Sequence, residues 1–256
     1  MSTLQQRRRT APGTLDTRVI IAAGLRLARG ADAPALRIRD LGRALGVDPS
    51  AVYRHFRNKD ELQRALLDEL LREVIDSTTI VPEEDWKGAL REQARIVLRV
   101  FGTYPMIGAL AATLLTRGPA EVDITELHLR GFRAAGLEGD ILIQHFGAYE
   151  SLLYSMAAAI AAVRSSNREA EPEDILWFDR TLDVTPQSHP LTAEYRVPIL
   201  TFGYHSLCLS SVDLILDSAE RGRRRLSSGT LGRSRPSGHT WASKCPHQDL
   251  NPGPTD

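Results

Sequence analysis

Two short stretches with helical spacing of apolar residues, separated by a glycine, constrain this chain more than any other feature. Residues 37–45 carry apolar side chains three and four positions apart, and Gly46 follows directly. Asp48 and Pro49 then begin another helix, because the carboxylate accepts from first-turn N–H groups and proline needs none. We expect helices over 37–45 and 49–56, joined by a turn in which Gly46 takes positive φ. This is helix-turn-helix spacing.

Helices are also expected on both sides of this pair. Residues 17–29 form a broad apolar stripe that Gly30 is placed to end. Asn58 is placed as the N-cap of a helix that runs to about Ser77, with Glu61 positioned to reach back as in a capping box.

The rest of the sequence predicts further helices, because helical apolar spacing recurs and no hairpin or strand alternation competes with it. The residues from 165 to 190 are acidic and rich in proline, so we expect a long mobile loop with a short turn near 175–178. The fold class is therefore all-α. The expected helices are 83–103, 105–116, 121–135, 139–164 and 195–221.

The distribution of charge is strongly asymmetric although the total is zero. Residues 1–60 hold twelve basic and five acidic residues, a net of +7, and residues 61–220 have a net of −12. Residues 221–256 have a net of +5. A basic N-terminal segment on an acidic body favours a polyanionic partner such as nucleic acid held at one end. A solvated charged surface explains the charges alone equally well.

The sequence offers no constellation for catalysis or for a metal. Its cysteines are Cys208 and Cys245, too few for a disulfide framework or a four-ligand zinc site. The histidines lack HxxxH and HExxH spacing, and no serine lies in a G-x-S-x-G elbow. We expect no enzyme activity, no cofactor and no metal. With no secretory signal and no run of eighteen apolar residues, we expect a cytoplasmic protein without a membrane partner.

The segment LRIRDLGRALGVDPSAVYRHFRNKDELQRALLDEL, residues 36–70, resembles the N-terminal signature of the TetR family. With the first helix included, the resemblance reaches residues 17–75. The residues alone also fit two ordinary amphipathic helices of a bundle, and the resemblance favours the helix-turn-helix. It implies a sequence-specific regulator that binds double-stranded operator DNA, most simply a repressor. The alternative is a helical partner- or ligand-binding module without DNA binding.

The resemblance assigns roles only where residues match. It implies that Tyr53 and His55 contact phosphates and that Lys59 meets the DNA backbone at a helix N-terminus, where anions bind. Arg54 is suited to bidentate hydrogen bonds with guanine. The position of Arg54 varies in the family, so the operator sequence does not follow. The expected DNA-binding residues are Arg37, Arg39, Ser50, Ala51, Tyr53, Arg54, His55 and Lys59.

The resemblance also implies four parts of the chain and a homodimer. We expect a disordered basic arm over 1–13, a three-helix DNA-binding domain over 14–78, a larger ligand-binding and dimerisation domain over 79–225, and a disordered tail over 226–256. Helices near 139–164 and 197–221 occupy the positions that pair between subunits in such proteins. The alanines between 157 and 162 permit close helix approach, which a crossing within one chain explains as well.

A small-molecule effector, apolar or aromatic, is expected in the second domain, which looks like that of the tetracycline-repressor branch. Its effect on DNA binding would be a population shift without chemistry. Plain core packing explains any one of the bulky side chains there, and the set together favours a pocket. The expected ligand-binding residues are Trp86, Phe101, Tyr104, Met106, His145, Tyr149, Tyr154, Phe202 and His205.

Overall fold

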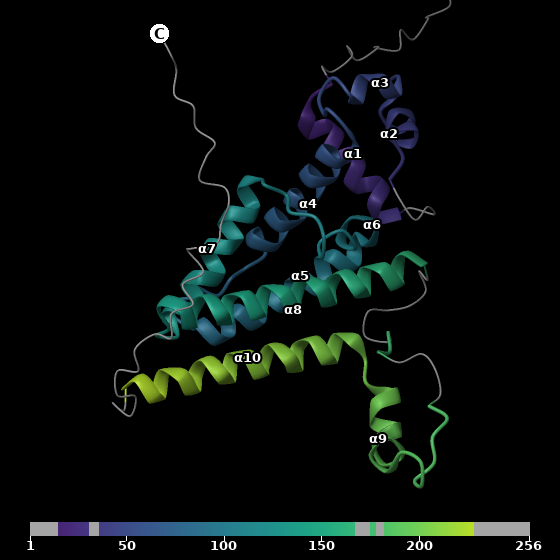
Figure 1. Cartoon of the computed structure of the whole chain (residues 1–256). Helices are drawn as coiled ribbons and strands as arrows, with labels where there is room; N and C mark the ends of the chain where they lie inside the picture. The colour runs from purple at the N-terminus through teal and green to yellow at the C-terminus, as the bar shows by residue number, and fades with distance from the viewer. Residues whose placement is uncertain (1–14, 31–35, 167–174, 178–181, 228–256) are drawn as a thin grey trace, which may run out of the picture.

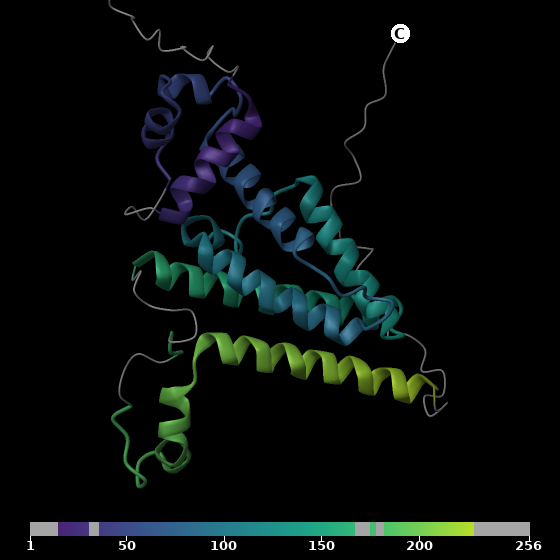
Figure 2. The ribbon, with the colours of Figure 1, turned by 180° about the vertical axis from the view of Figure 1, so that it is seen from behind.

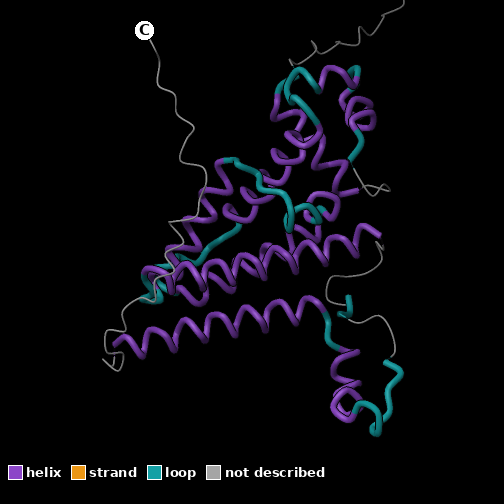
Figure 3. Tube along the Cα trace, in the orientation of Figure 1, coloured by secondary structure: helices purple, strands orange, loops and turns teal. Residues whose placement is uncertain are grey.

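A computed structural model describes residues 15–30, 36–166, 175–177 and 182–227 of the chain. Helices make up the structure, and the pairing outside them in these residues is a single antiparallel bridge between Leu176 and Gly203 (Figure 3). The expected all-α class is confirmed. The helices are α1 Thr17–Gly30, α2 Ile38–Leu45, α3 Pro49–Val52, α4 Lys59–Asp76, α5 Trp86–Thr103, α6 Pro105–Gly108, α7 Pro119–Ala134, α8 Gly139–Ser166, α9 Pro190–Thr201 and α10 Tyr204–Ser227.

The helices form two packed regions joined by α4. In Figure 1, α1, α2 and α3 lie at one end of the molecule, while α8 and α10 run side by side at the opposite end. The view from behind shows the same order (Figure 2). α4 packs against α1 near its start and against α5 and α7 further along, so it is a rigid connection between the two regions.

A row of leucines on one face of α4 explains why this helix is shared. Leu62, Leu66 and Leu70 are fully buried, and each contributes roughly 1.5–3 kcal/mol when removed from water. Leu67 and Leu71, one position further along the chain, are also buried. The apolar stripe expected from the sequence is therefore wide enough to face both regions.

α3, α5 and α6 differ from their expected bounds by three residues or more. α3 is α-helical only from Pro49 to Val52, and residues 53–55 continue as a hydrogen-bonded turn to Phe56, so the predicted extent of 49–56 was too long. α5 begins at Trp86, not at 83, because Asp85 caps it through a 2.9 Å bond from the Gly88 N–H. α6 ends at Gly108, and the predicted helix over 105–116 continues only as turns to residue 113.

The single helix expected over 195–221 is two helices. The chain leaves helical geometry at Phe202, where the backbone pairs with the segment 175–177 instead: the Trp177 N–H donates to Phe202 O at 3.0 Å and the Tyr204 N–H donates to Ile175 O at 2.8 Å. Pro198, which has no N–H to donate, already weakens the preceding turn. α9 has no buried residue and projects from the end of the bundle (Figure 1).

α8 is the central helix of the larger region. It packs against α5, α6, α7 and α10. Over Gly139–Ser165 it is also long and apolar enough to cross a membrane, the one such helix in the described residues, and one third of its most apolar stretch is buried inside the protein. Ala157, Ala158 and Ala161 are buried within the chain itself, so the close approach that they permit serves an intrachain crossing.

Parts of the expected organisation lie outside the described residues. These are the basic arm over 1–13, most of the loop over 165–190 and the tail from residue 228 onward. α10 extends to Ser227, so the expected start of the tail at 226 falls within the last turn of this helix.

Candidate functional site

The turn before α3 has the geometry that the sequence predicts. Gly46 ends α2 with φ 67° and ψ 29°, a left-handed conformation that glycine adopts without a Cβ penalty. At Gly42 a Cβ atom would lie 3.0 Å from Val47 O and 3.2 Å from the Cα of Pro49. The absence of a side chain at Gly42 therefore allows α2 and the start of α3 to pack closely.

Asp48 fixes the start of α3. Its Oδ1 accepts from the Ser50 N–H at 2.8 Å, and Pro49 occupies the first helical position. Hydrogen bonds from the Ser50 side chain and backbone lower the pKa of Asp48, with a smaller contribution from the charge of Arg54. Val52 and Phe56 anchor the other side of this segment in the core. The recognition segment, residues 49–56, is thus capped at its start by Asp48, and Val52 and Phe56 pack its inner side into the core.

The predicted DNA-binding residues all reach the surface of this end of the molecule. Tyr53 is 48% exposed, and Ala51 and His55 are half-buried. Within the described structure, none of the four cations in the set forms an ion pair, unlike the neighbouring Arg43, which pairs with Asp40 at 3.2 Å. The cations are available to an external anion. The exposed members are Arg37, Arg39, Ser50, Tyr53, Arg54 and Lys59.

The start of α4 presents unpaired backbone donors beside this surface. Asn58 caps the helix by accepting from the Glu61 N–H at 2.8 Å, as expected. The Glu61 carboxylate reaches back one residue further than expected and accepts from the Arg57 N–H at 2.6 Å. Among the described residues, nothing accepts from the N–H groups of Lys59 and Asp60. Such donors at a helix N-terminus form a ready anion site.

Residues 20–66, which include this whole arrangement, match the family described as bacterial regulatory proteins, tetR family. The N-terminal part of the chain is therefore similar to regulators of the TetR family. A curated relative is the HTH-type transcriptional repressor Rv1353c of Mycobacterium tuberculosis, 30% identical over 102 residues that make up 40% of this chain and 39% of the relative. The chain therefore matches about two fifths of the length of that relative.

Solved structures resemble the chain over most of its length. A putative transcriptional regulator from Streptomyces coelicolor A3(2) is 26% identical, with a TM-score of 0.63, over 81% of this chain and 98% of the other. The TetR family protein ActR of Streptomyces coelicolor, in complex with actinorhodin, is 20% identical, with a TM-score of 0.64, over 80% of this chain and 96% of ActR. The second likeness shows the fold alone.

The larger region of the chain contains a partly open cavity of about 70 Å³ between α4, α5, α7, α8 and the segment after α6. Its wall is mainly apolar, with a few polar side chains that converge on it, which is the usual character of a small-molecule site. Ten of the lining residues come from outside the predicted set. The cavity is lined by Leu67, Leu71, Phe101, Ala111, Leu114, Leu115, Thr116, Glu121, Ile124, Thr125, Glu150 and Tyr154.

The structure does not gather the predicted ligand-binding residues around one cavity. Phe101 and Tyr154 line the internal cavity, with ring centroids 5.9 Å apart. The Tyr149 hydroxyl donates to Leu90 O at 2.7 Å, and the His145 ring bridges to Ser218 of α10 at 3.3 Å, so both hold helices together. Trp86 lies at the start of α5, and Tyr104 and Met106 lie around the start of α6, away from this cavity. His205 is half-buried at the start of α10.

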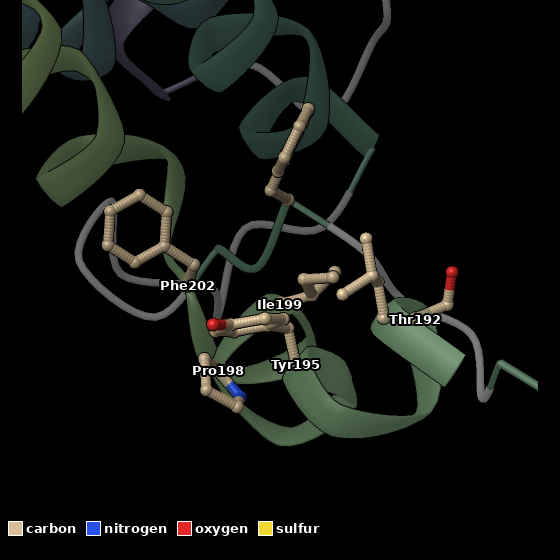
Figure 4. Close-up of a pocket in the computed structure, with 7 residues that line it drawn as sticks. Thr192, Tyr195, Pro198, Ile199 and Phe202 are labelled. Atoms are coloured by element: carbon tan, nitrogen blue, oxygen red, sulfur yellow. The ribbon is translucent and has the colours of Figure 1, made fainter. Parts of the chain in front are cut away.

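Phe202 lines a different hollow, a groove of about 540 Å³ along α9. Figure 4 shows Tyr195, Ile199 and Phe202 around it. The groove is apolar, and its side chains are largely exposed, including Leu191 at 69% and Trp177 at 47%. The sequence predicted a continuous helix here and therefore did not predict the groove.

Two cavity-lining carboxylates were also missed. Glu150 is the only Asp, Glu, Lys or Arg of α8 between Asp140 and Arg164, an isolation that the sequence displays. Its Oε1 contacts Nδ1 of His128, which is fully buried. Glu121 accepts from the N–H groups of Thr116 and Arg117. A charged residue alone on an apolar helix could have directed attention to this wall.

The remaining reactive groups offer no second site. Burial raises the pKa of the Cys208 thiol to about 12, which keeps it protonated and unreactive. In the part of the chain that the structure describes, no three His, Cys, Asp or Glu side chains come together where a metal ion could be held.

Proposed function

We propose that this chain is a sequence-specific DNA-binding regulator, most simply a repressor, that a small-molecule effector releases from its operator. The observation that carries the proposal is the capped recognition segment with its unpaired cations, beside the free N–H groups at the start of α4. Phosphates position such a segment on DNA, and exposed side chains in the major groove read bases. The curated relative named as a transcriptional repressor supports the same function.

We assign phosphate contacts to Tyr53, His55 and Lys59 and base reading to Arg54 and its neighbours. Tyr53 and Lys59 are exposed, and Lys59 lies at the helix terminus whose N–H groups have no acceptor. Arg54 extends from the exposed side of the turn that follows α3. Its guanidinium makes no ion pair in the described structure, so a guanine in the major groove does not have to displace one.

The chain acts as a homodimer in this proposal, through α8 and α10. Both helices expose large apolar side chains, including Ile143 at 58% and Leu214 at 67%. A shallow hollow of about 300 Å³ between these helices includes Leu214, Ile215 and Ala148. A twofold pairing of this face would place two recognition segments for successive half-sites.

Effector binding reaches the DNA-binding end through α4. The Asp68 carboxylate, in the middle of α4, accepts from the Thr116 hydroxyl at 2.8 Å and from the N–H groups of Ala120 and Glu121 at 3.3 and 3.1 Å. Thr116 and Glu121 line the cavity. A ligand that moves this wall therefore pulls on α4, whose first residue is Lys59. Lys59 lies nine residues before Asp68, or about 14 Å along the helix.

A second connection joins the two regions at the end of α1. The Arg29 guanidinium donates to the Tyr104 hydroxyl at 3.0 Å and lies 5.1 Å from the centre of its ring. Tyr104 separates α5, which carries the cavity residue Phe101, from α6. If the recognition segment has two orientations, a ligand that favours one of them through these contacts shifts the population between DNA-binding and released states.

Selection of bound fragments from genomic DNA tests the proposal. The full chain is mixed with sheared DNA at several salt concentrations, and retained fragments are sequenced and then challenged with a small-molecule library. We expect a shared inverted repeat, and release by one class of compound. Retention without any shared sequence would contradict sequence-specific binding, and no retention at any salt concentration would leave the alternative, a helical partner- or ligand-binding module without DNA binding. The proposed regulator is cytoplasmic and performs no catalysis.

A further inference from the structure

The polar wall of the internal cavity is acidic. Its lining includes the carboxylates of Glu121 and Glu150 and contains no lysine or arginine. Glu121 already accepts from two backbone N–H groups, which stabilise its charge. Glu150 has no such support from the backbone, so it dominates the electrostatic character of the cavity.

The charge of Glu150 is incompletely paired. Its Oε1 contacts His128, and among the described residues its Oε2 has no hydrogen-bond partner. No lysine or arginine forms an ion pair with Glu150 in the described structure. The side chain is only 22% exposed, so water solvates it poorly. A partly buried carboxylate of this kind gains free energy from a cationic donor placed beside it.

The hydroxyl of Tyr154 is a second polar group without a partner. Its oxygen is buried and makes no hydrogen bond with any of the described residues, although the residue lines the cavity. Burial, together with the nearby charge of Glu150, raises the pKa of Tyr154 well above 10, so the hydroxyl stays protonated near neutral pH. A buried hydroxyl without a partner costs free energy that a polar ligand group restores.

We propose that the effector is a small cationic amphiphile, an aromatic or other apolar body that carries a protonated amine. This inference rests on the proposed function and narrows the effector from any apolar or aromatic molecule to one charge class. The ammonium group donates to Glu150 and to the Tyr154 oxygen, while the body packs against Phe101, Leu71 and Ile124. The negative charges of Glu121 and Glu150 on the same wall would repel a ligand that carries a carboxylate.

Size determines how such a ligand acts. Drug-sized ligands occupy cavities of roughly 300–1,000 Å³, and this cavity holds about 70 Å³. The wall must therefore move, and the part of it that lies outside the α-helices is the segment 109–118. Thr116 lies on that segment and bonds to Asp68, so the displacement passes to α4.

Three probes of similar size and different charge test the proposal: 2-phenylethylamine, 2-phenylethanol and phenylacetate, repeated in a naphthyl series. Calorimetric titration into the full-length protein measures affinity. We expect the amine to bind at least about tenfold more tightly than the alcohol, and the carboxylate most weakly. Glu150→Gln should remove the preference for the amine, and Tyr154→Phe should weaken amine binding. Glu126→Gln, on the exposed side of α7, is the matched control and should change nothing.

Binding of the carboxylate as tight as that of the amine, an unchanged preference in Glu150→Gln, or no binding by either series would overturn the inference. Urea unfolding of each variant identifies any loss of folding. Release of operator DNA, measured separately, distinguishes the two proposals. An amine that binds through Glu150 without releasing DNA contradicts the proposed function alone. Release by an anionic compound contradicts only the charge class.

Discussion

Replacing Asp68 by alanine tests the contact through which the cavity wall is proposed to hold α4. The carboxylate accepts three hydrogen bonds, from the Thr116 hydroxyl and from two N–H groups at the start of α7. A side-chain cap contributes about 1 kcal/mol and a charge at a helix N-terminus about 0.3–1 kcal/mol. The hydroxyl bond adds about 1 kcal/mol. Asp68→Ala should thus lower the free energy of unfolding by about 2–3 kcal/mol.

Urea unfolding followed by circular dichroism, at one fixed protein concentration, measures this change. Glu69→Ala is the control, because Glu69 is the exposed neighbour on the same helix. It should change the free energy of unfolding by less than about 0.5 kcal/mol. Asp68→Asn keeps one accepting oxygen and should fall between the two. Equal unfolding free energies for Asp68→Ala and Glu69→Ala would refute the reasoning, because the three bonds would then contribute nothing net.

Four further substitutions test the roles proposed for different residues. Arg54→Ala should cost about 1–3 kcal/mol of binding free energy at one base-pair position of the operator. Lys59→Ala should weaken binding to all DNA sequences alike and reduce the slope of log affinity against log salt concentration by about 1. Equal effects of the two substitutions in a binding-site selection would contradict this division. Tyr149→Phe should lower the unfolding free energy by about 1 kcal/mol and leave effector affinity unchanged, because the Tyr149 hydroxyl bonds to Leu90 O. Loss of effector binding in calorimetry would instead place Tyr149 in the effector site. Burial opposes ionisation of Glu92, but hydrogen bonds from Thr79 and Ile80 outweigh it and lower its pKa below 4.5. The ionised Glu92 carboxylate therefore stabilises the fold fully above pH 4.5, and this contribution is lost as the pH falls through the lowered pKa. The difference in unfolding free energy between the parent and Glu92→Gln should shrink only on acidification. A difference that grows on acidification would show that the pKa of Glu92 is raised.

The DNA-binding end could be predicted because its information is local. Gly46, Asp48 and Asn58 each act on the backbone within a few positions, through a positive φ or a capping bond, and these bonds are present. The buried leucines of α4 follow from spacing along one helix. Where local signals compete, the prediction failed: the apolar pattern over 195–221 continues through Phe202, but backbone pairing with 175–177 breaks the helix.

The cavity could not be predicted in the same way, because it depends on which helix faces meet. Tyr149 and Tyr154 lie on the same helix, yet the hydroxyl of Tyr149 is bonded to Leu90 and that of Tyr154 has no partner. Residue type does not distinguish them. Glu150 is visible in the sequence as an isolated charge, but it is not one of the bulky amphipathic side chains from which the pocket was predicted.

Hydroxyl-radical footprinting of a selected genomic fragment tests the central claim most directly. A dimer with two recognition segments should protect two half-sites on one face of the duplex, with centres about 34–36 Å apart or a multiple of this distance. Protection should disappear when the effector is added. Uniform or sequence-independent protection, or a footprint unaffected by every compound that binds the protein, would contradict the account of an effector-released DNA-binding regulator.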